Sequence, residues 1–134
     1  MSCVLRASGP LFDVDEFLRH SPFAPTKVWH KGEPRTSHAS SKLADTSGFN
    51  LVVSSADFDD LSRQIADAME FLREHNGELS RLSTFPGVEG VTLDFGVRRR
   101  EVVAQFDRFP PGLLGLAGGL AIGIELSQYT ISGV

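Results

Sequence analysis

The sequence has 134 residues, close to the commonest domain size, so we expect a single domain over residues 1–134. Hydrophobic residues make up 41% of the chain and charged residues 22%, which gives enough apolar surface for the chain to fold on its own. The net charge of −4 is the opposite of the basic balance typical of nucleic-acid-binding proteins, so no nucleic-acid partner is predicted.

The first predicted elements are a strand at residues 2–8 and a short helix after it. Asp13 followed by Glu16 has the spacing of a capping box at the start of that helix, which stops before a Ser-Pro pair. Cys3 is the only cysteine, so an internal disulfide framework is excluded, and the N-terminal stretch lacks the apolar run of a signal peptide. A cytoplasmic location is therefore expected.

A second strand is predicted at residues 24–32, in "APTKVWHKG", with Trp29 between two lysines on one face and His30 on the other. Residues 32–48 have no apolar periodicity and are rich in Ser, Thr, Gly and Pro, so we interpret them as one long polar loop. Loops of this length are usually functional or disordered. The candidate binding residues of this region are Trp29, His30, Arg35 and His38.

A third strand at residues 49–55 leads into the longest predicted helix. The apolar residues of this helix recur at three- and four-residue steps, which is typical of an amphipathic helix that lies on a sheet. They are Phe58, Leu61, Ile65, Met69 and Leu72. We expect Ser54 or Ser55 to cap the start of the helix, and Asn76-Gly77 to end it.

Residues 88–97 and 101–109 both alternate apolar with polar side chains, which predicts two strands joined as a hairpin. The predicted turn carries Arg98, Arg99 and Arg100, the one basic cluster of the sequence. Such a turn is usually a solvated tip, and otherwise contacts an anion or an acidic partner.

The stretch "FPPGLLGLAGGLAIGIELSQY" at residues 109–129 is apolar and rich in glycine. Its uncharged part is too short for a membrane-spanning helix, which needs about 20 residues, so no membrane association is predicted. Its glycines follow the predicted helix instead of preceding it, which argues against a phosphate-binding loop. We expect a short helix that starts at Pro110-Pro111, a left-handed cap at Gly118-Gly119, and a strand with one buried face.

The predicted order is strand, helix, strand, strand, helix, strand, strand, helix, strand. It indicates an α+β fold with a mixed, mostly antiparallel sheet and two or three helices packed on one face. With its "KVWHKGEPR" segment, long helix, hairpin and phenylalanine-led short helix, the region from Ala24 to Tyr129 resembles a family of small bacterial proteins of unknown function. Some members of that family look like immunity proteins of toxin systems. The resemblance implies a fold and no chemistry, and this chain departs from it at Gly118-Gly119.

No catalytic residue, metal site or cofactor is predicted. The four histidines are separated by ten, eight and thirty-seven residues, and with a single cysteine they form no metal-ligand spacing. The carboxylates of Asp59 and Asp60 are explained by the dipole of the helix that they begin, and those of Glu101 and Asp107 by exposed strand positions.

Two functions remain open on the sequence alone. In the first, the chain is a non-catalytic protein-binding module, of the immunity type or another kind, that engages a protein partner through residues 27–45 or the arginine turn. The alternative is a small enzyme with a polar pocket formed by residues 27–38. An enzyme needs a concave pocket in which several of these groups converge, whereas a binding module can present them on an open face.

Overall fold

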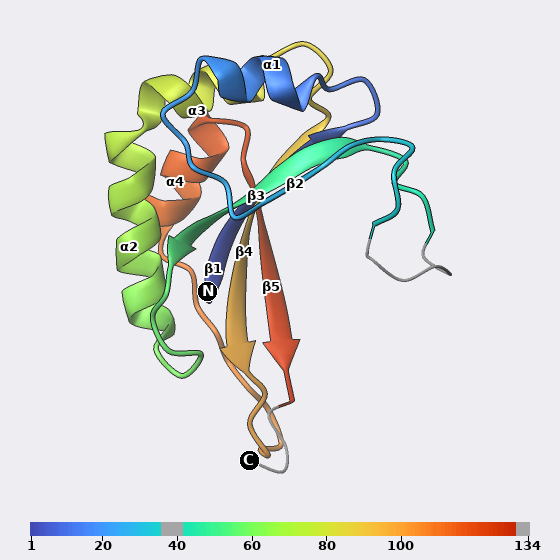
Figure 1. Cartoon of the computed structure of the whole chain (residues 1–134). Helices are drawn as coiled ribbons and strands as arrows, with labels where there is room; N and C mark the ends of the chain where they lie inside the picture. Colours follow the sequence, from blue (N-terminus) through green and yellow to red (C-terminus); the bar gives the residue numbers. More distant parts are fainter. Residues whose placement is uncertain (36–41, 131–134) are drawn as a thin grey trace.

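The computed structural model describes residues 1–35 and 42–130, and over these residues four helices pack against a five-stranded sheet (Figure 1). The strands are β1 (Cys3–Gly9), β2 (Lys27–Trp29), β3 (Ser47–Ser54), β4 (Gly90–Arg98) and β5 (Gly123–Tyr129). The helices are α1 (Val14–Arg19), α2 (Leu61–Glu74), α3 (Asn76–Ser83) and α4 (Pro111–Gly119). The predicted α+β class is confirmed, with one helix more than the two or three expected.

The strands lie in the order β2-β3-β1-β4-β5. β1 is antiparallel to both of its neighbours, β2 is antiparallel to β3, and β5 alone runs parallel to its neighbour, β4. Leu5 at the centre of β1 lies opposite Leu51 of β3 and Leu93 of β4, so the three leucines share one face. The sheet is therefore mixed and mostly antiparallel, as predicted.

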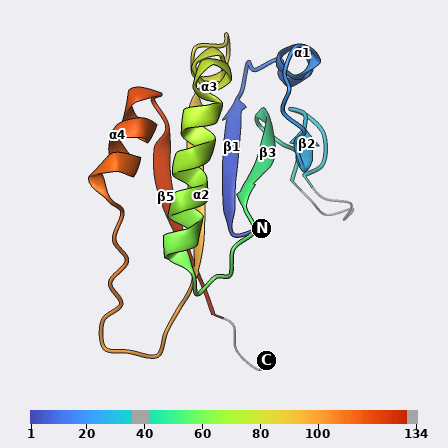
Figure 2. The same cartoon turned by 90° about the vertical axis from the view of Figure 1, so that its left-hand side faces the viewer.

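The hydrophobic core lies between that face and the helices. α2, α3 and α4 lie on one side of the sheet, and Figure 2 shows α2 and α4 in front of its strands. α1 closes one end of the same layer, where the ring of Phe17 stacks on that of Phe49 in β3 with centroids 5.8 Å apart. The helices contribute these buried side chains to the core: Val14, Phe17, Ile65, Ala68, Leu72, Leu79, Leu82, Leu113 and Ala117.

The long helix starts later than the sequence predicted. Asp60 caps it, because its carboxylate accepts a hydrogen bond from the backbone N–H of Arg63 at 3.0 Å. Ser54 ends β3 instead, and its hydroxyl donates to Asp67 at 2.6 Å. The predicted serine cap is therefore wrong, because a turn of several residues separates the strand from the helix.

The long helix ends close to the predicted stop at Asn76-Gly77, but these two residues do not cap it. α2 ends at Glu74, and Asn76 and Gly77 are the first residues of α3. From the sequence, residues 78–87 are expected to be a further turn of helix or a loop. Leu79 and Leu82 of α3 are fully buried in the core, and their burial explains why the chain continues as a second helix.

The predicted hairpin after β4 is absent. Both neighbours of β4 are already in place, β1 on one side and the parallel strand β5 on the other, so no edge is left for residues 101–109. These residues form no strand, and Val103 and Phe106 are exposed. A parallel pair needs a crossover connection, which here runs through residues 99–110 and α4 (Figure 2).

The C-terminal helix is confirmed, but its predicted glycine cap is wrong. Gly118 and Gly119 lie inside α4, and the residue with a left-handed backbone is Ala121, at φ 58°. Ile122 then donates its backbone N–H to the carbonyl of Ala117 at 2.9 Å. β5 lies at the edge of the sheet, with Ile124 partly buried.

The described parts of the predicted loop 32–48 are joined to each other by backbone hydrogen bonds. Gly32 donates its backbone N–H to the carbonyl of Ala44 at 2.8 Å, and Ala44 donates to Glu33 at 2.8 Å. These bonds extend the antiparallel pairing of β2 and β3 beyond the strands, and Ala44 is buried.

Among the helices of the described residues, none has both the length and the apolar character that a membrane span requires.

Candidate functional site

Within residues 1–35 and 42–130, one face of the sheet carries no helix, and its side chains alternate with those of the core. In β1, Arg6 lies between the buried residues Leu5 and Ala7, and it sits opposite Asn50 of β3. We call this surface the uncovered face and define it by Arg6, Lys27, Trp29, Asn50, Asp94 and Glu125. It combines charged, amide and aromatic groups on a rigid element.

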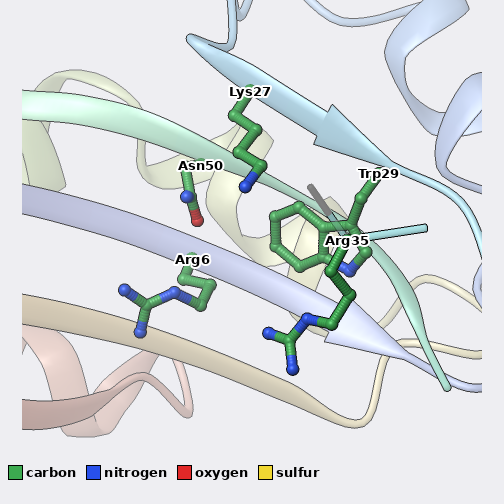
Figure 3. A pocket seen from close by; sticks show the side chains of 5 residues that line it. All are labelled: Arg6, Lys27, Trp29, Arg35 and Asn50. Carbon is green, nitrogen blue, oxygen red and sulfur yellow. The ribbon is translucent and has the colours of Figure 1, made fainter. Parts of the chain in front are cut away.

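Three polar side chains form a row across three adjacent strands. Arg6 of β1 is opposite Asn50 of β3, and Asn50 is opposite Lys27 of β2. Residues directly opposite one another share a face, so the three side chains lie side by side. Together with Trp29 and Arg35 they line a hollow of about 370 Å³ (Figure 3).

Trp29 forms a wall of this hollow, and its position depends on a glycine. It lies opposite Gly48 of β3, where a Cβ atom would come within 2.6 Å of the indole Cζ2. The indole Nε1–H donates to the hydroxyl of Thr46 at 3.2 Å, which fixes the orientation of the ring. Arg35 follows β2 and is held by a hydrogen bond from its backbone N–H to the carbonyl of Lys42 at 3.2 Å.

Of the three cations in the hollow, Arg6 has carboxylate partners among the described residues, whereas Lys27 and Arg35 have none. Arg6 lies 3.4 Å from Asp94 of β4 and 3.3 Å from Glu125 of β5. The described residues offer no such ion pair to Lys27 or Arg35. Positive charge therefore exceeds negative charge in the hollow.

Asn50 adds an unused polar group. Its Oδ1 is buried and accepts no hydrogen bond within the described part of the chain. A buried acceptor without a donor is costly, so a hydrogen bond to this oxygen would stabilise the protein once the side chains around it move to admit a donor.

His30, a predicted member of the same site, lies elsewhere. Its Nε2 is 3.0 Å from the carboxylate of Asp15 at the start of α1, and its Nδ1 is 3.5 Å from Glu33. The hydrogen bond with Asp15 is the main cause that raises the pKa of His30 above its ordinary 6.5. Of the predicted group, the structure brings Trp29 and Arg35 together and leaves His30 apart, while His38 falls outside the described residues.

The three predicted arginines do not belong to the hollow either. Arg98 lies six residues beyond Thr92, the β4 partner of Arg6, and six residues of strand span about 20 Å. Its Nε donates to Asp59 at 2.8 Å, and the backbone N–H of Arg99 donates to the carbonyl of Tyr129. Arg100 lies 3.8 Å from Asp107. The cluster is therefore the end of β4 and the start of the crossover, and not the tip of a hairpin.

Sequence reasoning missed Arg6 and Asn50. The sequence does mark both residues as facing away from the core, since each is a polar side chain between two apolar ones inside a predicted strand. That alternation does not predict which strands become neighbours. It therefore does not predict which polar residues meet. The approach of Arg35 to Trp29 depends in addition on the pairing beyond β2 and β3.

The described lining of the hollow consists of three cations, an amide and an indole. Among the described residues that line it there is no carboxylate, histidine, cysteine or hydroxyl group, and Lys27 is the one side chain of a type that serves as a base or nucleophile in enzymes. The described residues also contain no group of three His, Cys, Asp or Glu side chains that could hold a metal ion. The prediction that the protein binds no metal and no cofactor stays a prediction.

Comparisons of the chain with protein-family models, with curated proteins and with solved structures gave no match. The resemblance to a family of small bacterial proteins therefore stays a prediction. Any functional conclusion rests on the uncovered face and on the hollow in it.

Proposed function

We propose that this protein is a non-catalytic protein-binding module, of the immunity type or another interaction class, and that the uncovered face is its binding surface. The observation that carries the proposal is the asymmetry of the sheet. The helices cover one face, while the other presents a row of charged side chains beside a tryptophan (Figure 3). Aromatic and arginine side chains are enriched at the centres of protein interfaces.

The alternative, a small enzyme with a pocket in residues 27–38, is less well supported. It needs His30 beside Trp29 and Arg35 as an acid or base, and His30 is bound to Asp15 instead. The described lining of the hollow supplies cations, an amide and an indole, which favour binding over proton transfer. Bacterial origin, a cytoplasmic location and the absence of a nucleic-acid partner stay predictions from the sequence.

The test compares what the immobilised protein retains from a lysate of its source cells. We expect the parent to retain a protein partner that the double variant Lys27→Glu and Arg35→Glu loses, because two charges of the uncovered face are reversed. The matched control is the double variant Arg63→Glu and Arg73→Glu, which reverses two exposed arginines on the helix side. Mass spectrometry of the retained proteins is the measurement.

Equal retention by the parent and the Lys27 and Arg35 variant would contradict the proposal. So would loss of the partner from the control variant alone, because the binding surface would then lie on the helix side. Thermal unfolding of all three proteins verifies that the variants are folded, and exposed substitutions of this kind usually change stability by less than about 0.5 kcal/mol.

A further inference from the structure

We propose that the hollow at Arg6, Lys27, Trp29, Arg35 and Asn50 receives the carboxylate side chain of an extended acidic segment of the partner protein. The inference deepens the proposed function and rests on it, because it names the chemistry that the uncovered face recognises. Three observations carry it, namely the excess of cations, the unsatisfied amide and the position of the helices.

The excess of cations is a local property of a chain whose net charge is −4. Arg6 is neutralised by Asp94 and Glu125, at 3.4 Å and 3.3 Å. Lys27 and Arg35 have no carboxylate partner among the described residues, and residues 36–41, "TSHASS", contain no Asp or Glu that could serve as one. Cations gathered around one space attract an anionic group, and a planar guanidinium fits a carboxylate.

The amide of Asn50 is compatible with a ligand that brings donors as well as acceptors. Its buried Oδ1 has no hydrogen-bond donor, although Arg6 and Lys27 beside it are donors themselves, and those cations need acceptors. An acidic peptide supplies both, because its backbone carries N–H groups and its side chains carry carboxylates. Inorganic phosphate supplies mainly acceptors.

The placement of the helices also favours a carboxylate over a phosphate. Phosphate sites typically use the backbone N–H groups at the N-terminus of a helix. Here the helices lie on the opposite side of the sheet from the hollow, and the cations project from strands and from the chain after β2 (Figure 1, Figure 3). A volume of about 370 Å³ lies at the small end of ordinary ligand pockets, which suits a side chain of a segment that lies across the face.

Trp29 is the only tryptophan of the chain, so its fluorescence reports directly on the hollow. The experiment titrates the full-length protein with hexaglutamate, with hexaglutamine and with inorganic phosphate. We expect a saturable change of fluorescence with hexaglutamate that weakens as salt is added, and no such change with the other two probes. Shifts of the side-chain NMR signals of Trp29 and Asn50 provide a second readout.

The variants Lys27→Gln and Arg35→Gln are each expected to weaken hexaglutamate binding about tenfold or more, the loss typical of a charged hydrogen bond. The matched control Arg73→Gln, on the exposed side of α2, should bind like the parent. Absence of hexaglutamate binding, or equal binding by the Lys27 and Arg35 variants, would overturn the inference. Binding of phosphate as tight as that of hexaglutamate would overturn it as well, and would assign the hollow to a free anion.

Failure of this inference can be told apart from failure of the proposed function. If hexaglutamate does not bind but reversal of the Lys27 and Arg35 charges still abolishes partner capture, the uncovered face binds a partner by other chemistry. If hexaglutamate binds but capture is insensitive to that reversal, the hollow is an anion site outside the partner interface, and both proposals are wrong.

Discussion

At the scale of single residues, His30 connects two parts of the chain that lie apart in sequence. Its Nε2 lies 3.0 Å from Asp15 of α1 and its Nδ1 lies 3.5 Å from Glu33, so a protonated imidazole can donate to both carboxylates. These contacts raise the pKa of His30 above 6.5, with the Asp15 hydrogen bond as the main cause. His30, a candidate binding residue in the sequence, is thus a pH-dependent link between α1 and the end of β2.

The raised pKa of His30 determines how its contribution to stability changes with pH. Because the pKa is higher in the folded than in the unfolded chain, the stabilisation is fully present below about pH 6.5 and is lost as the pH rises through the folded pKa. The side chains of His30 and Asp15 are 39% and 62% exposed, so solvent screening keeps the effect on the free energy of unfolding below ~1 kcal/mol. An NMR titration should give His30 a pKa above 6.5 in the parent and a lower one in Asp15→Asn, and identical values in the two proteins would contradict the assigned contact.

At the scale of elements, the end of α4 shows whether Gly118 is a left-handed helix cap or an ordinary helical residue. A left-handed cap at Gly118 would make any other residue there unfavourable. The structure instead places Gly118 in the helix without a positive φ, with open space where a Cβ would be, and gives the left-handed backbone to Ala121. α4 therefore has a glycine at an ordinary helical position, where any residue fits. The turn after the helix has an alanine at a left-handed position, where glycine would be more favourable.

The substitution Gly118→Ala is accordingly expected to raise the free energy of unfolding by about 0.5–1 kcal/mol, the usual difference between the two residues inside a helix. Ala121→Gly should not destabilise the protein, because it relieves the left-handed alanine. Urea denaturation of both variants is the measurement. A loss of stability in Gly118→Ala would instead support the glycine cap that the sequence predicted.

At the scale of the whole molecule, the hydrophobic core of the described residues lies between the sheet and the helices. The sequence predicted Leu61, Ile65 and Met69 of α2 to be buried against the sheet. Ile65 is buried, while Leu61 and Met69 are partly buried and pack against the core. The stability of the protein should therefore depend on the helix side, and the uncovered face should be free for binding.

Truncation of Ile65 to Ala is expected to lower the free energy of unfolding by roughly 2–5 kcal/mol, because it leaves a cavity between α2 and the sheet. The matched control is Glu70→Ala, an exposed position of the same helix, which should change stability by less than about 0.5 kcal/mol. Equal unfolding midpoints for the two variants in urea would show that Ile65 is not packed as described.

The sequence by itself determined the elements whose periodicity is local. Alternation in residues 2–8 and 88–97 and the three- and four-residue steps of the long helix identified β1, β4 and α2, and the paired prolines identified α4. It also determined which face of each strand is apolar, since side chains of a strand alternate with period two. The α+β class followed from these features alone.

Only the tertiary structure decided which strands are neighbours. Residues 101–109 alternate as a strand does, but β5 takes the place beside β4, so they remain outside the sheet. In the same way, the hollow exists because Arg6, Asn50 and Lys27 meet across β1, β3 and β2. The physical reason is that strand pairing joins residues far apart in the chain. The local pattern of a single segment does not show which of several candidate strands will occupy an edge of the sheet.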